Sequence, residues 1–147
     1  MKSIFEAATR EDLVLRIQSI KPGDTALWGK MTLYQMLRHC ILWDEMVERK
    51  RKYKQVFIGK LFGKVIMKKV LKDDAPLRKN TPTLPVLKIV GSGEIEPEKV
   101  HGIKNIQNYA AFSNTEFVHP FFGKMTREQI GILVYKHTDH HLRQFGA

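Results

Sequence analysis

The chain has 147 residues and a formal net charge of +10, with 43% hydrophobic and 27% charged residues. This balance is typical of a soluble globular protein of one domain, and no apolar run approaches the roughly 18 residues of a membrane span. The opening segment interrupts its apolar residues with charges, which excludes a secretion signal, and one cysteine, Cys40, excludes an intramolecular disulfide. We therefore expect one cytoplasmic domain over residues 1–147.

The positive charge is concentrated in one window. Between Arg49 and Lys72 there are ten Lys or Arg residues and no Asp or Glu, so this window accounts for the whole excess. Such a window can dock on nucleic acid or on an anionic membrane surface. It can equally be a solvated face, or a wall that attracts an anionic substrate. Few aromatic residues and no nucleic-acid motif accompany it, which favours the second interpretation and predicts no specific nucleic-acid partner.

Helix signals divide the chain into five segments. Periodicity and caps predict helices over about 10–20, 32–52, 55–71, 97–112 and 126–145. The first has Thr9 as its predicted N-cap, and the second and last open with the capping boxes Thr32/Gln35 and Thr126/Gln129. Prolines forbid a long helix over 73–93, and 113–124 is expected to be an aromatic-rich loop. These elements predict an all-α protein, an antiparallel helical bundle.

The 55–71 segment is amphipathic. Lysines recur at i, i+4 and i+8 along one side, and apolar residues sit opposite them. Two glycines, Gly59 and Gly63, weaken its helical propensity.

The last helix carries the most specific pattern, YKHTDHHLRQF. At 100° per residue, His137 and His141 project along the apolar stripe of this helix, one turn apart. Two helical imidazoles at i, i+4 can bind one metal ion, or they can be a hydrogen-bonded core pair. His140 lies at the edge of the stripe, as a group that supports or borders the site, and Asp139 is expected to point into solvent.

A third ligand is less well defined by periodicity. His39 lies in the middle of the second helix but beside its apolar stripe, on the side of Trp43. Cys40 is expected to be a small core residue. Asp44 projects into the stripe, where it can bond a ligand histidine or pair with Arg or Lys.

Three segments together resemble the DinB/YfiT-like superfamily, in its small branch of unassigned function. They are WGKMTLYQMLRHC, FVHPFFGKMTREQ and YKHTDHHLRQFG, of which the ending H-x-x-H-H-L-R-Q is the most specific. The resemblance implies a four-helix bundle with an up-down-down-up arrangement. It also implies a metal ion held by His39, His137 and His141, with His119 of the HPFFG loop bordering the site or only forming a turn.

The resemblance says less about the reaction. Some relatives are transferases or isomerases that use low-molecular-weight thiols, so we expect zinc or nickel, a small thiol and a small-molecule substrate. A metal-dependent hydrolase, or a non-catalytic bundle with a basic surface, are the alternatives. Aromatic residues can wall the substrate or fill the core equally well: Trp28, Trp43, Phe117 and Phe121. A homodimer is compatible with the sequence.

Overall fold

The computed structural model describes residues 1–48, 54–114 and 116–147. The helices of these residues are α1 (Ala7–Ser19), α2 (Leu33–Val47), α3 (Phe57–Val70), α4 (Ile95–Asn108) and α5 (Arg127–Gln144), with two 3₁₀ turns at Pro85–Leu87 and Tyr109–Ala111. Strands β1 (Val118–His119) and β2 (Gly123–Lys124) pair antiparallel in a short hairpin. Within the described residues, no helix has the length and apolar character needed to cross a membrane.

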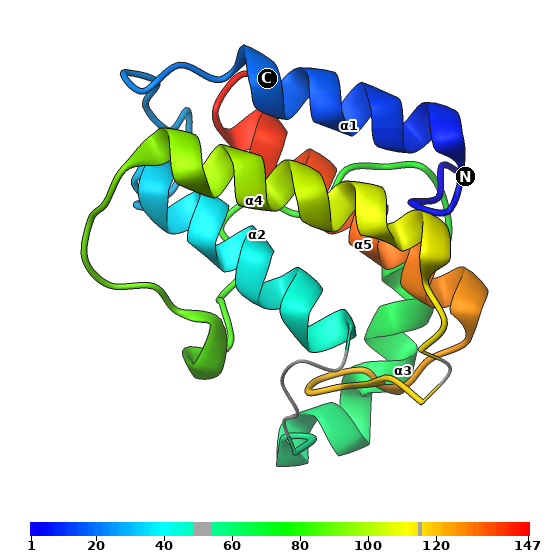
Figure 1. The fold of residues 1–147 in the computed structure, drawn as a ribbon. Coiled ribbons are helices and arrows are strands. Elements are labelled where there is room, and N and C mark those ends of the chain that lie inside the picture. The colour runs from blue at the N-terminus through cyan, green and yellow to red at the C-terminus, as the bar shows by residue number, and fades with distance from the viewer. Residues whose placement is uncertain (49–53, 115) are drawn as a thin grey trace.

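Four of the helices form the bundle. In Figure 1, α2 and α4 run side by side in the same direction, and α1 and α5 run in the opposite one. The order along the chain is therefore up, down, down, up, as the resemblance implied. Helix α3 and the hairpin lie together at one end of this bundle (Figure 1). The prediction of an all-α, DinB/YfiT-like four-helix bundle is confirmed.

The capping boxes fix where the two histidine-bearing helices begin. The Thr32 hydroxyl accepts a bond from the Gln35 amide, and the Gln35 side chain accepts one from the Thr32 amide. Thr126 and Gln129 repeat this exchange at α5. Each box satisfies backbone donors that a helix start leaves unpaired, so both predicted starts are confirmed.

The predicted bounds of α1 and α4 differ from those of the structure, in which α4 runs over Ile95–Asn108 and not over 97–112. Helix α1 begins at Ala7 with Glu6 as its N-cap. The predicted cap, Thr9, therefore lies inside the first turn, where its hydroxyl donates to the Glu6 carboxylate. Helix α2 ends at Val47, and the end predicted near Lys52 lies outside the described residues.

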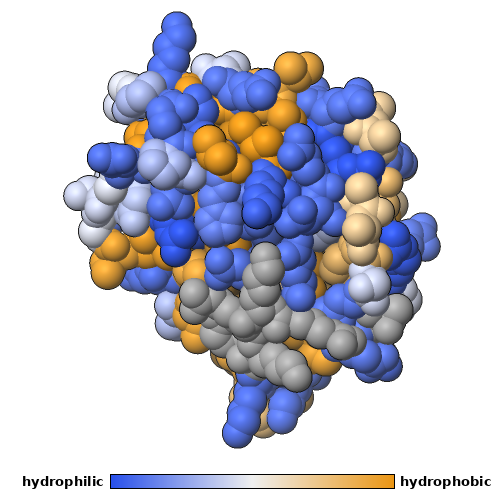
Figure 2. All heavy atoms as spheres, in the orientation of Figure 1, coloured by the Kyte–Doolittle hydropathy of each residue, from blue (hydrophilic) through white to orange (hydrophobic). Residues whose placement is uncertain are grey.

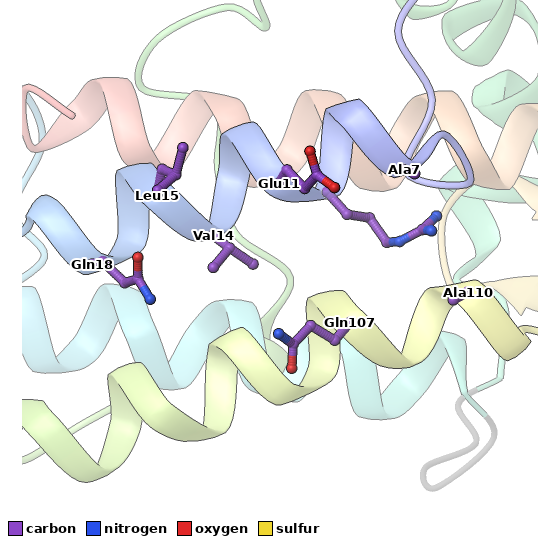
Figure 3. Close-up of a pocket in the computed structure, with 8 residues that line it drawn as sticks. Ala7, Glu11, Val14, Leu15, Gln18, Gln107 and Ala110 are labelled. Carbon is purple, nitrogen blue, oxygen red and sulfur yellow. The ribbon is translucent and has the colours of Figure 1, made fainter.

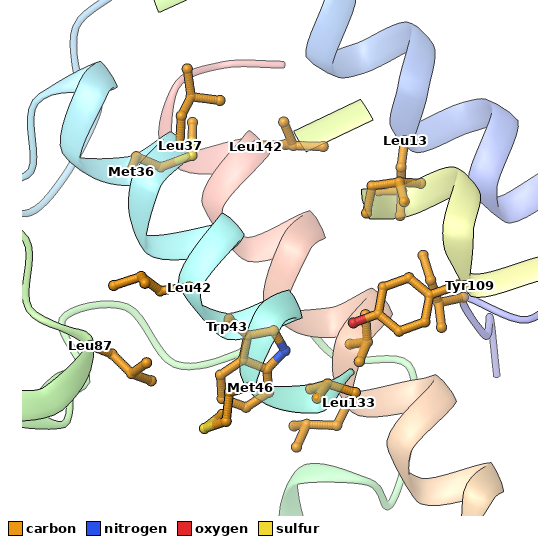
Figure 4. Packing of buried hydrophobic residues seen from close by; sticks show 14 of the residues in the cluster. Leu13, Met36, Leu37, Leu42, Trp43, Met46, Leu87, Tyr109, Leu133 and Leu142 are labelled. Atoms are coloured by element: carbon orange, nitrogen blue, oxygen red, sulfur yellow. The ribbon is translucent and has the colours of Figure 1, made fainter. Parts of the chain in front are cut away.

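The core lies between α1, α2, α4 and α5. Figure 4 shows part of this cluster, with Met36, Leu37 and Trp43 on α2 and the hydroxyl of Tyr109 turned towards the interior. These side chains are almost fully buried, and burial of this kind contributes about 1.5–3 kcal/mol for each large side chain.

The solvated position expected for Asp139 is wrong. Its side chain is buried, and it accepts bonds of 2.8 Å from both Arg16 and Arg143. Helix α1 packs on the side of α5 that faces away from the histidines, so α5 is covered on two sides. The paired guanidinium groups then supply the partners that a buried carboxylate requires.

Candidate metal centre

Three histidines from two helices converge inside the bundle. His39 comes from the middle of α2, and His137 and His141 lie one turn apart on α5. One ring nitrogen of each lies within 4.8 Å of the others, and the Nε2 atoms of His39 and His137 are 2.9 Å apart. The structure thus brings together all three residues that the sequence and the resemblance proposed as ligands.

The His39 ring is oriented by a loop that connects α3 to α4. Its Nδ1–H donates, at 2.9 Å, to the backbone carbonyl of Leu87, the last residue of the 3₁₀ turn Pro85–Leu87. Because a carbonyl can only accept, this bond assigns the proton to Nδ1 and leaves the Nε2 lone pair facing the centre. A carbonyl behind a histidine in this way is typical of metal ligands.

The His141 ring is oriented by its own helix. Its Nδ1–H donates to the side-chain oxygen of Gln144 at 2.9 Å, and the amide nitrogen of Gln144 donates to the Trp28 carbonyl at 2.8 Å. The second bond fixes which end of the Gln144 amide faces His141. The Nε2 atom of His141 is therefore left with a lone pair as well.

The His137 ring is held by stacking. It lies on the indole of Trp43 with the ring centres 4.3 Å apart and the planes inclined by 20°. Within the described part of the chain, its Nδ1 is buried without a hydrogen-bond partner. Trp43 was expected to wall the substrate or to fill the core, and it lies directly against one of the three rings.

Burial keeps the three imidazoles neutral. Desolvation is the largest cause that lowers each pKa, and the neighbouring histidines lower the values of His137 and His141 further. The pKa of His141 falls to about 3. Neutral imidazole is the form that binds metal ions, so none of the three needs to lose a proton near neutral pH.

These features fit a divalent metal ion. Two imidazole Nε2 atoms that face one another at 2.9 Å need either a proton or a cation between them. Nitrogens bound about 2.1 Å from one tetrahedral ion lie about 3.4 Å apart. The 2.9 Å pair would therefore open by about 0.5 Å, and the widest pair, at up to 4.8 Å, would close by up to about 1.4 Å. The triad can hold a metal ion.

His140 and His119 lie beside the triad without joining it. His140 packs edge-on against Trp28, with ring centres 5.7 Å apart. The Nδ1 of His119 accepts bonds from the amides of Phe121 and Phe122, which is the turn-forming role considered for this His-Pro. The ring centres of His119 and Trp43 lie 5.0 Å apart. Burial lowers the pKa of His119 to about 3.

Asp44 and Cys40 belong to the core next to the centre. The Tyr109 hydroxyl donates to the Asp44 carboxylate at 2.9 Å. Burial raises the pKa of the Cys40 thiol well above its usual range, and the Asp44 charge raises it further. Cys40 is therefore a neutral core thiol, as expected, and not the thiolate that a metal would require.

Two groups that orient the ligands were missed by the sequence analysis. Gln144 follows His141 by three residues on the same helix, so helical spacing alone could have indicated it. The Leu87 carbonyl has no sequence signal, since its partner lies 48 residues away and any residue type supplies a carbonyl.

A surface groove lies away from this centre. A groove of about 610 Å³ runs between α1 and α4, lined by Val14, Leu15 and Gln107 among others (Figure 3). Arg10 at its edge is engaged with the Ile4 carbonyl, and none of the three histidines lines the groove. It does not extend the candidate centre.

Comparison with known families assigns the chain. The family model described as "Protein of unknown function (DUF1569)" matches residues 5–147. Comparison with curated proteins and with solved structures finds no match. Since the matched region includes both histidine-bearing helices and nearly the whole chain, the protein belongs to the DUF1569 family, a DinB/YfiT-like family.

Proposed function

We propose that this protein binds one divalent metal ion, zinc or nickel, and uses it to transfer a low-molecular-weight thiol to a small electrophilic substrate. The observation that carries the proposal is the convergence of three neutral imidazoles, two of them held by oxygen acceptors behind the ring. Imidazole suits both metals, and three protein ligands leave a coordination position open.

The chemistry follows from that open position. A divalent ion held by His39, His137 and His141 would keep its full positive charge, because the imidazoles are neutral, and would favour the thiolate form of a small thiol. The sulfur then forms the new bond with its electron pair, the substrate's leaving group departs with its own pair, and the thiol proton passes to water. The chain's part is to orient the rings, through Leu87, Gln144 and Trp43, and to keep them neutral through burial.

Hydrolysis of a small substrate is the alternative. It would use a carboxylate as general base, but the nearby carboxylates have other partners. Asp139 is paired with Arg16 and Arg143, and Asp44 accepts from Tyr109. The arrangement therefore favours thiol transfer over hydrolysis.

The first test is metal content. Protein purified without an affinity tag or a nickel column should contain about one zinc or nickel per chain, by elemental analysis. His137→Ala and His141→Ala should each lose the metal. His140→Ala is the matched control from the same helix, and it should retain most of it. Unchanged metal in a His137→Ala/His141→Ala double variant would rule out the three-histidine site.

The second test addresses the thiol. Adding a small biological thiol to cobalt-substituted protein should produce a sulfur-to-cobalt charge-transfer band. The same thiol should react faster with an electrophilic probe when the metal-loaded protein is present, and His39→Ala should remove the acceleration. Metal binding with neither a band nor acceleration across several thiols would reject the transferase and leave hydrolysis or simple metal binding.

A further inference from the structure

Helix α3 turns its apolar side outward. Six large apolar side chains of this helix are exposed, from 40% for Ile66 to 74% for Phe57; the others are Ile58, Leu61, Phe62 and Val65. At 100° per residue they cover about half of the circumference of the helix. An amphipathic helix normally buries such a side, and a contiguous exposed patch of this kind marks an interaction surface.

The orientation of α3 is fixed by its glycines. Gly59, Gly63 and Met67 form its buried side. A Cβ atom on either glycine would collide with the backbone carbonyl of Phe121, so the helix lies directly on the loop of the hairpin. No bulkier side of α3 can replace the glycine side at this distance.

Both ends of the helix are also held. The Val56 amide donates to the Pro120 carbonyl at 2.8 Å, and the buried Lys136 ammonium of α5 donates to the Val70 carbonyl at 2.8 Å. Rotation of α3 about its axis would break these contacts. The apolar side is therefore exposed as a consequence of the fold.

Lysines border this apolar side. Lys60, Lys64 and Lys68 line one edge of it, Lys69 lies within it, and Lys54 and Lys72 flank the helix. All six are exposed, and no Asp or Glu occurs between Lys54 and Lys72. Figure 2 shows hydrophobic and hydrophilic atoms adjoining at the lower end of the molecule, where Figure 1 places α3.

We propose that this face of α3 docks on the surface of an anionic lipid bilayer. A helix in the plane of a membrane interface needs an apolar side for the acyl boundary and lysines for the lipid phosphates, and α3 presents both. Its 14 residues are fewer than the roughly 20 that cross a bilayer, so it would lie on the surface.

Two other occupants fit the charge and the apolarity less well. A second copy of the chain docked through the same face would bring two sets of lysines together with no acidic residue between them. Nucleic acid would satisfy the lysines but would leave Phe57, Leu61 and Val65 against a polar phosphate backbone. The anionic bilayer is the occupant that matches both halves of the surface.

Co-sedimentation with vesicles tests the proposal. The purified protein should sediment with vesicles of phosphatidylcholine mixed with phosphatidylglycerol, and not with phosphatidylcholine alone. Phe57→Gln/Val65→Gln should lower the partition coefficient by at least about tenfold, and Lys60→Glu/Lys64→Glu should do the same. Because all four side chains are exposed and none belongs to the histidine centre, these variants should fold as the wild type does, whether or not a metal ion is bound. The result is therefore independent of the proposed function.

Matched controls come from the other helices. Leu15→Gln/Val100→Gln removes two side chains that are each 66% exposed on α1 and α4, and Lys21→Glu/Lys104→Glu makes the same change of charge away from α3. Both should bind vesicles as the wild type does. Equal loss in the controls, or no vesicle binding by the wild type, would overturn the proposal. So would a dimer that Phe57→Gln/Val65→Gln converts to a monomer, or DNA binding that depends on the lysines alone.

Discussion

Single side chains behind the ligands decide how well the triad is preorganised. Gln144 is the clearest case, because it accepts from His141 with its oxygen and donates to the Trp28 carbonyl with its nitrogen. The second bond prevents the amide from turning its nitrogen towards the ring. His141 is thus held with its Nε2 lone pair towards His39 and His137, before any ion arrives.

Removing that acceptor gives a prediction for metal affinity. Gln144→Leu keeps the volume of the side chain but leaves the His141 ring without its acceptor, so the affinity should fall by about 10–100-fold. Competition with a chelating dye measures the change. Arg143→Gln, at the neighbouring exposed position, is the control and should bind metal normally. Equal affinities for Gln144→Leu and the wild type would show that Gln144 does not support the ligand.

At the scale of the element, α3 shows that close packing and amphipathic pattern can point in different directions. Its glycines allow the helix axis to approach the hairpin backbone more closely than any side chain would permit. This approach leaves the apolar residues on the outer side, where a lipid surface is the occupant proposed above.

Glycine substitutions measure that contact. Gly63→Ala places a methyl group against the Phe121 carbonyl, and it should destabilise the protein by about 1–3 kcal/mol in spite of the higher helical propensity of alanine. Gly102→Ala in α4 is the matched control, because nothing lies within 4 Å of the added atom. It should stabilise the protein by about 0.5–1 kcal/mol.

Denaturant unfolding of the two variants at the same pH gives both values. If Gly63→Ala were as stable as Gly102→Ala, α3 would have to lie farther from the hairpin than the structure places it. The membrane-facing orientation of its apolar side would then lose its main support.

At the scale of the whole molecule, buried neutral histidines make stability depend on pH. The pKa values of four of them are lowered in the folded state, chiefly by burial: His39, His119, His137 and His141. In the unfolded chain each would take up a proton near pH 6.5. Above that pH these histidines do not lower the free energy of unfolding. Below it, the free energy of unfolding decreases as the pH falls towards the lowered folded-state pKa values.

The metal-free protein should show this loss directly. A histidine with a pKa of about 3, such as His119, should cost about 2 kcal/mol of unfolding free energy between about pH 7.5 and pH 5. His119→Asn keeps an acceptor for the Phe121 and Phe122 amides but cannot take up a proton, so its stability should fall less over the same range. Urea titrations at the two pH values compare them, and parallel losses in both proteins would contradict a buried neutral His119.

Local features of the chain were determined by the sequence alone. The capping boxes at Thr32 and Thr126 predicted where α2 and α5 begin, because a cap involves residues only three apart. The same locality placed His137 and His141 on one face of one helix. The resemblance then supplied the bundle arrangement and the third histidine, His39.

Only the tertiary structure decided how these local pieces meet. Helical periodicity gives the directions of side chains relative to one another, but not the rotation of one helix against its neighbour. For that reason the pattern could not show that Asp139 is buried between Arg16 and Arg143, or that α3 buries its glycines and exposes its apolar side. The Leu87 carbonyl behind His39 was equally hidden, since a backbone oxygen acquires its role only when the chain brings a distant loop to it.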